Sequence, residues 1–288
     1  MFDRIRNSFA LARSSWDVLR QNRRFILFPI FSGIGCTLVL ASFAVPLAIA
    51  AMNGGFDVHA HKQPPWWTYV IAFAFYFCNY FVIVFCNSAL ISCAVMTFAG
   101  EEPTVGDGFR AAAARLPQIL AWALLSATVG VLLKVIENAH QRGSEIISFL
   151  LGTAWTVITF FVVPVLVVEK AGPFEAIRRS VQLLKDAWGE ALFEHWGLGF
   201  FMFLLAIPGV VLLFLGIGLA TQVPPIGLLI VAVAIIYLLG CSAASSALNT
   251  IFLAALYQWA AYKTLPVSFS RAEIEGAFQP KSRRWDNY

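Results

Sequence analysis

Charged side chains are scarce in this sequence. Only 12% of the 288 residues are Asp, Glu, Lys or Arg, whereas 59% are hydrophobic. A soluble domain carries about 25% charged residues. The mean hydropathy of +0.76 agrees with this deficit. A chain this apolar aggregates in water unless lipid covers it, so the composition excludes an ordinary soluble globular protein.

The sequence also lacks the basic patch of a nucleic-acid-binding protein, although its formal net charge is +4. The Lys and Arg residues lie in short segments that flank long apolar runs. This distribution orients a protein in a membrane. We therefore expect membrane lipids as partners, including anionic headgroups at the cytoplasmic face, and no nucleic acid.

Recognisable catalytic and metal-binding motifs are absent from the sequence as well. It contains no HExxH, Walker loop, GxSxG or CxxC motif. His59 and His61 lie near Asp57, but a solvated loop explains them better than a metal site. The five cysteines all lie inside apolar runs, where cysteine behaves as a small hydrophobic residue. We expect no catalytic residue, no cofactor, no metal and no disulfide.

Long apolar runs are what the sequence does contain. A membrane-spanning helix needs about 20 apolar residues. Six stretches qualify: Phe25–Met52, Trp66–Ala99, Ile119–Ile136, Ile146–Val168, Trp196–Ala220 and Ile226–Ala261. Pro224-Pro225 separates the last two, because a double proline interrupts a helix. The second and sixth stretches exceed what a span requires, and the sequence leaves open whether each is one continuous helix.

The basic residues predict the orientation. Most of the 20 Lys and Arg residues fall before the first span, in the second-to-third and fourth-to-fifth connections, and after the sixth span. The other side holds only Lys62, Lys134 and Arg142. By the positive-inside rule, both termini lie in the cytoplasm. The long first apolar run also favours a retained span over a cleaved signal peptide.

Amphipathic segments occupy the predicted cytoplasmic side. One face of a helix near the N terminus carries Ile5, Phe9, Ala12, Trp16 and Leu19, and another carries Phe174, Ile177, Val181, Leu184 and Trp188. We expect a cytoplasmic amphipathic helix over residues 1–24, a six-span membrane domain over 25–262, and a cytoplasmic tail over 263–288. Interfacial helical segments are expected at about 104–117 and 173–189.

The fold class that follows is an all-α polytopic integral membrane protein. Its six transmembrane helices form three hairpins, each preceded by an interfacial amphipathic helix. Ile5-Arg6-Asn7-Ser8 aligns with Ile177-Arg178-Arg179-Ser180, which is consistent with a repeated unit.

Four residues stand out as functional candidates. Asn79 and Asn87, in the second span, either form interhelical hydrogen bonds or line a polar path. Pro164, in the fourth span, precedes Glu169 by five residues. Proline frees a backbone carbonyl, so this pair predicts a kink, or a hinge that couples the span to the following helix. Lys134 and Glu137 are spaced to pair with each other.

Several motifs resemble an uncharacterised family of bacterial multi-span membrane proteins, domain of unknown function 6159. They are Leu27-Phe28-Pro29, Asn79-Tyr80-Phe81-Val82, Pro103-Thr104-Val105-Gly106-Asp107-Gly108, the stretch from Phe160 to Trp188, Ala254-Ala255-Leu256-Tyr257 and Gly276-Ala277-Phe278. The resemblance implies a six-span inner-membrane protein and brings no activity. The opening is also weakly similar to the sulfate-channel family, from which the remainder departs.

Three functions remain open at this stage. The first is a non-enzymatic inner-membrane protein that acts as a scaffold or supports an envelope complex, with a protein partner or a second copy bound through helix faces. The second is a channel or carrier for a lipid or small anion. The third is an interfacial lipid-modifying enzyme, for which Glu169, Glu194 and His195 would supply the reactive groups.

Overall fold

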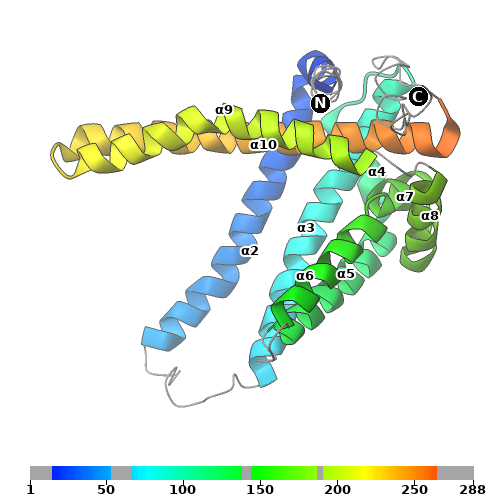
Figure 1. The fold of residues 1–288 in the computed structure, drawn as a ribbon, viewed down its shortest axis with the longest axis horizontal. Coiled ribbons are helices and arrows are strands. Elements are labelled where there is room, and N and C mark those ends of the chain that lie inside the picture. Colours follow the sequence, from blue (N-terminus) through cyan, green and yellow to red (C-terminus); the bar gives the residue numbers. More distant parts are fainter. Residues whose placement is uncertain (1–14, 53–65, 138–143, 187–190, 265–288) are drawn as a thin grey trace, which may run out of the picture. The chain divides into compact units, whose positions relative to one another are not determined.

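The structure is a computed structural model, and it describes residues 15–52, 66–137, 144–186 and 191–264. Within these ranges the protein is all-helical (Figure 1). Residues 15–21 are helical and continue into a short 3-10 turn, η1. The predicted face of the N-terminal amphipathic helix lies mostly outside the described residues.

The long helices follow the apolar runs of the sequence, and short amphipathic helices lie between them. Their bounds are η1 (Arg23–Ile26), α2 (Leu27–Met52), α3 (Trp66–Phe98), α4 (Val105–Ala113), α5 (Leu116–Glu137), α6 (Ser144–Ile158), α7 (Val162–Val168), α8 (Pro173–Asp186), α9 (Ala191–Ala220) and α10 (Pro224–Tyr262). Six helical stretches are long and apolar enough to cross a membrane. One of them, Ile146–Val168, consists of α6 and α7 together.

The two longest helices are continuous, which answers a question that the sequence leaves open. α3 has 33 residues and α10 has 39. At about 1.5 Å per residue each exceeds the roughly 30 Å of a hydrocarbon core. α10 begins at the double proline, with proline in its first turn. Proline suits this position because the first-turn N–H groups have no helical partner.

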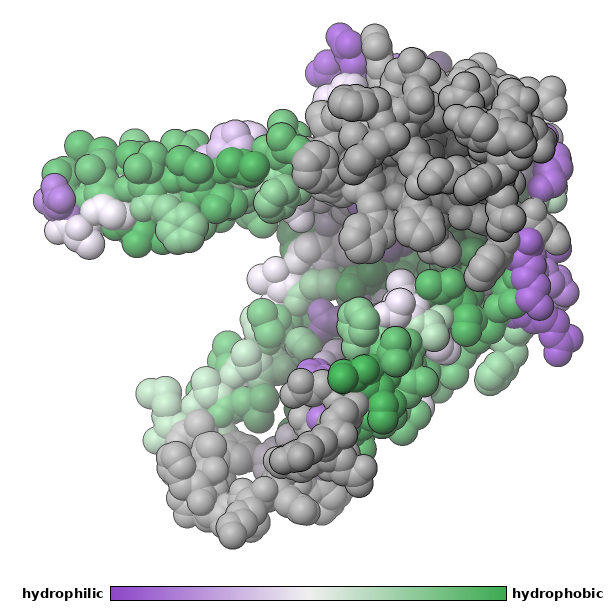
Figure 2. Space-filling view, viewed as in Figure 1, coloured by the Kyte–Doolittle hydropathy of each residue, from purple (hydrophilic) through white to green (hydrophobic). Residues whose placement is uncertain are grey.

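The described chain divides into two compact units. In the first, α9 and α10 run side by side along their length. Glycines let their backbones approach: a Cβ at Gly216 would lie 2.9 Å from the backbone nitrogen of Val231, and one at Gly227 would lie 2.2 Å from that of Ala220. Hydrophobic residues cover most of the visible surface of this pair in Figure 2, and polar residues gather at its tip. Such a surface suits lipid rather than water.

One polar bond also joins α9 to α10. The Tyr237 hydroxyl donates to the Leu205 carbonyl at 2.7 Å. Leu205 lies three residues before Pro208, which is inside α9. The bond therefore joins α10 to α9 within one turn of this proline.

The second unit contains most of α2 and α3 together with α4 to α8. Aromatic rings pack its helices: Phe31 of α2 and Phe85 of α3 both contact Phe109 of α4. The stacked rings of Trp122 and Trp155 join α5 to α6, with centroids 5.8 Å apart. These contacts support the α4–α8 region, where the polar residues of interest lie.

Candidate functional site: the junction between the fourth span and α8

The fourth span is broken rather than merely kinked. α6 ends at Ile158 and α7 begins at Val162, with a turn between them. Pro164 is buried in the first turn of α7. Its ring excludes the carbonyl four residues before it, which is that of Phe160, so a regular helix cannot continue through this turn. The sequence predicts a kink at Pro164, and the structure instead has an interruption centred four residues before it.

The break changes the backbone hydrogen bonds at two positions. In a regular helix the Val162 N–H would bond to the Ile158 carbonyl, but here it donates to the Thr159 carbonyl. The Val157 carbonyl, which would accept from the Phe161 N–H, accepts from the Phe160 N–H instead. The Ile158 carbonyl and the Phe161 N–H thereby lose their helical partners. Buried backbone groups without partners are costly, particularly in a membrane protein.

A single hydroxyl on α8 bonds to both groups. Ser180 Oγ donates to the Ile158 carbonyl at 2.7 Å and accepts from the Phe161 N–H at 3.1 Å. Ser180 is fully buried. It lies on the face of α8 that also buries Ala176 and Leu183. We did not predict this role, and the only signal was a polar residue on an otherwise apolar buried face.

An ion pair ties the other end of α7 to α8. Arg179 Nε lies 3.1 Å from Glu169 Oε1, and both side chains are partly buried. Lys170 adopts a left-handed conformation with φ 60°, so the chain can turn sharply between the two helices. Glu169 and the backbone at the Pro164 break are thus both bonded to α8. Whether this junction acts as a hinge stays a prediction.

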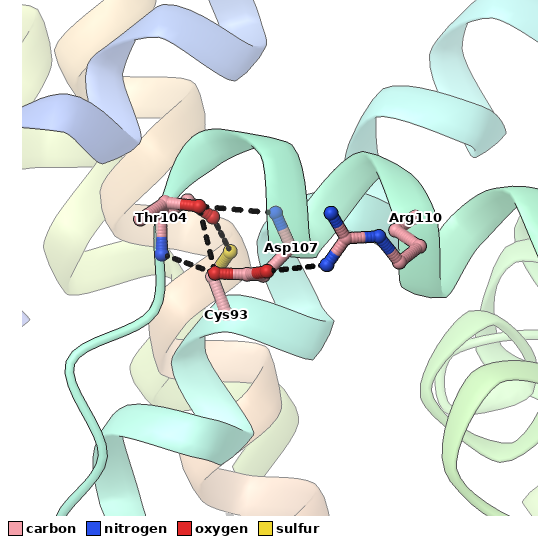
Figure 3. Close-up of polar contacts among 4 residues, drawn as sticks. All are labelled: Cys93, Thr104, Asp107 and Arg110. Atoms are coloured by element: carbon pink, nitrogen blue, oxygen red, sulfur yellow. Dashed lines mark hydrogen bonds and ion pairs between the residues drawn. The ribbon is translucent and has the colours of Figure 1, made fainter.

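A second polar cluster begins α4 (Figure 3). Thr104 and Asp107 form a reciprocal capping box: the Asp107 N–H donates to Thr104 Oγ1, and the Thr104 N–H donates to Asp107 Oδ2. Arg110 pairs with the same carboxylate at 2.8 Å. The hydrogen bonds from Thr104 and the charge of Arg110 hold the pKa of Asp107 below its usual range. Cys93 of α3 reaches the Thr104 carbonyl through its sulfur at 3.6 Å.

The cluster explains why one motif of the sequence has its composition. Pro103-Thr104-Val105-Gly106-Asp107-Gly108 is the start signal of α4. Gly108 is buried. The motif therefore has a structural role in fixing where α4 begins.

The two asparagines do not meet. Asn79 Nδ2 donates to the Phe75 carbonyl at 2.9 Å, one turn earlier in the same helix, rather than to a neighbouring helix. A carbonyl in the preceding turn is within easy reach of a short amide side chain, which satisfies it locally. Asn87 lies two turns further along α3 and is half-buried. A polar lining by these residues stays a prediction.

The remaining candidates are placed as follows. Lys134 Nζ and Glu137 Oε2 are 3.0 Å apart, which confirms the predicted pair. His59 and His61 lie outside the described residues. Glu194 and His195 belong to the first turns of α9. Among the described residues, no group of three or more His, Cys, Asp or Glu side chains is arranged to hold a metal ion.

In the part of the chain that the structure describes, six helical stretches are long and apolar enough to cross a membrane, which is the pattern of a multi-pass α-helical membrane protein. The chain belongs to a family of unknown function (DUF6159), whose sequence profile matches residues 67–265. That range includes α3, α4, the broken span, α8 and both long helices of the first unit. No curated protein and no solved structure matches the chain.

Proposed function

We propose that this protein is a non-enzymatic scaffold of the bacterial cytoplasmic (inner) membrane that supports an envelope complex, with both termini in the cytoplasm. The observation that carries the proposal is the junction of the fourth span with α8. Ser180 and the Glu169–Arg179 pair hold α8 at the end of that span. α8 is bonded to the chain both before and after α7. Its outer face therefore has a fixed orientation, as a binding surface requires.

The distribution of charge supports this orientation. Arg110, Arg115, Arg178 and Arg179 lie in the two described connections that the positive-inside rule assigns to the cytoplasm. Lys134 lies at the end of α5 that is far from Arg115, and its positive charge is paired with Glu137. α8 is then a cytoplasmic element.

Within this proposal the junction transmits movement between the membrane and α8. Pro164 sets the position of the break, and Glu169 links the end of α7 to Arg179. Because Ser180 bonds to backbone on both sides of the break, a tilt of α6 relative to α7 displaces α8 as well. A binding event on α8 and a change in the span are therefore coupled through the same three hydrogen-bonded contacts.

Native mass spectrometry on protein extracted gently from its own membrane tests the scaffold. We expect a reproducible protein adduct that persists through purification. A strictly solitary protein would contradict the scaffold.

A channel or carrier for a lipid or small anion is the second candidate, and the broken fourth span favours it. Carriers often build their binding sites from interrupted helices, whose backbone groups face the substrate. In that case vesicles containing the purified protein should show protein-dependent flux of a small anion such as sulfate, or of a fluorescent phospholipid. Asn79→Ala and Asn87→Ala should lower the flux. If neither probe shows protein-dependent flux, the protein does not carry these two substrates.

A further inference from the structure

The outward side of α8 combines apolar and basic side chains. Phe174 is 78% exposed, and Ile177 and Val181 are half-buried. Arg178 and Lys185 are exposed. Phe174, Arg178 and Lys185 have the spacing i, i+4, i+11 and so share one stripe of the helix, with Ile177 and Val181 beside it.

α8 cannot rotate to bury this side. Ala176, Ser180 and Leu183 form the opposite side and are almost completely buried. The two hydrogen bonds of Ser180 and the Arg179–Glu169 ion pair fix the rotation of the helix about its axis. Phe174 therefore stays outside the unit for as long as the junction is intact. Together with Ile177 and Val181, Phe174 forms an apolar strip along the outer side of α8, and such a strip suits a lipid surface.

Charge indicates what covers it. The stripe carries two positive charges beside apolar side chains, whereas Glu175, which is exposed, lies on a different side of the helix. Anionic lipid provides both matching features: acyl chains for Phe174, Ile177 and Val181, and phosphate groups for Arg178 and Lys185. α8 also directly follows a membrane-spanning helix, so a lipid surface is close to it.

We infer that the α8 stripe, defined by Phe174, Ile177, Arg178, Val181 and Lys185, binds an anionic lipid surface. The stripe lies in the plane of the interface, with Phe174 inserted among the acyl chains. The two basic side chains extend along the apolar surface towards the headgroups, as long basic side chains do at membrane boundaries. This deepens the proposed function by naming the partner of α8, and it rests on that function only for the position of α8 at the membrane.

Photolabelling of the full chain in nanodiscs tests the inference. One set of nanodiscs contains a trace of photoactivatable phosphatidylglycerol, and a second contains the same amount of photoactivatable phosphatidylcholine. Mass spectrometry measures the label on the peptide that covers residues 171–185. We expect roughly 25-fold more label from the anionic lipid, which is the product of one factor of about five for each of the two basic residues. Removing either basic charge should lower this preference by about fivefold, because each basic residue near an anionic surface contributes roughly 1 kcal/mol.

The variants separate charge from folding. Arg178→Gln combined with Lys185→Gln should bring labelling by the anionic lipid to the level of the neutral lipid. Arg178→Lys keeps the charge and should keep the preference. Glu175→Gln, an exposed substitution outside the stripe, is the control and should leave the preference unchanged or slightly higher.

Three outcomes would overturn the inference: equal labelling by both lipids, a preference that survives loss of both charges, or a protein cross-linked to α8 in place of lipid. Failure here is distinguishable from failure of the scaffold. A protein adduct in native mass spectrometry with no lipid preference on α8 would sink only the lipid surface. Strong anionic labelling of a protein that is otherwise solitary would sink only the scaffold.

Discussion

At the break in the fourth span, one hydroxyl replaces two helical hydrogen bonds. Ser180 comes from a helix that begins nine residues after Pro164, yet it bonds to Ile158 and Phe161 on both sides of the interruption. The serine and the proline are therefore complementary. The proline prevents a continuous helix, and the serine satisfies the backbone groups that this leaves without partners.

Replacing Ser180 with Ala should lower the free energy of unfolding by about 1–3 kcal/mol, because a buried N–H and a buried carbonyl each lose a partner. Unfolding in detergent micelles measures the change. Thr153→Ala is the control, because Thr153 is exposed in the same span and bonds only within its own helix. It should cost much less, and an equal cost for both would contradict the role of Ser180.

Asp107 gives α4 a defined dependence on pH. Its folded pKa is below the usual range, chiefly because Thr104 donates to its carboxylate and Arg110 lies close by. A depressed pKa means that the stabilisation is complete above the unfolded value of roughly 3.9 and is lost as the pH falls through the folded value. The difference in unfolding midpoint between the wild type and Asp107→Asn should stay constant from neutral pH to about pH 5. It should then shrink below roughly pH 4, and a difference that grows on acidification would argue against the capping box.

At the scale of helices, close approach depends on residues without side chains. α9 and α10 run side by side, and Gly216 occupies a point where the Val231 backbone leaves no room for a Cβ. Lipid provides little hydrophobic drive for helices to associate, so this kind of backbone proximity contributes much of the attraction.

Gly216→Ala should force α9 and α10 apart and destabilise the pair by about 1–3 kcal/mol, as overpacking does. Gly218→Ala is a matched control, since a Cβ there meets nothing within 4 Å. It should be neutral, or stabilising by up to about 1 kcal/mol through helix propensity. Thermal unfolding in one detergent compares the two variants, and equal losses would count against the packing role of Gly216.

At the scale of the whole molecule, the pattern of basic residues makes a prediction about topology. A green fluorescent protein fused after Tyr288 should fluoresce, because that end is predicted to be cytoplasmic. Alkaline phosphatase inserted between Met52 and Trp66 should be active, because that connection is predicted to face outward. The same enzyme inserted between Ala99 and Thr104 should be inactive. The reverse pattern would invert the orientation and place α8 on the other side of the membrane.

The sequence by itself determined the features that depend on neighbours along the chain. Apolar runs of sufficient length predict six spans, the double proline predicts the boundary between α9 and α10, and the three-residue spacing of Lys134 and Glu137 predicts their ion pair. Each of these three features follows from helix geometry or from the missing N–H of proline, and none of them requires knowledge of a distant partner.

Tertiary structure alone decided the contacts that span a change of chain direction. Lys170 gives no signal of a left-handed conformation, yet the turn it makes brings Arg179 to Glu169 and Ser180 to Ile158. The same holds for Gly216, which is indistinguishable in sequence from Gly218 two residues later. Only the position of Val231 on the opposite helix makes one of them irreplaceable, because steric exclusion depends on which backbone lies across the contact.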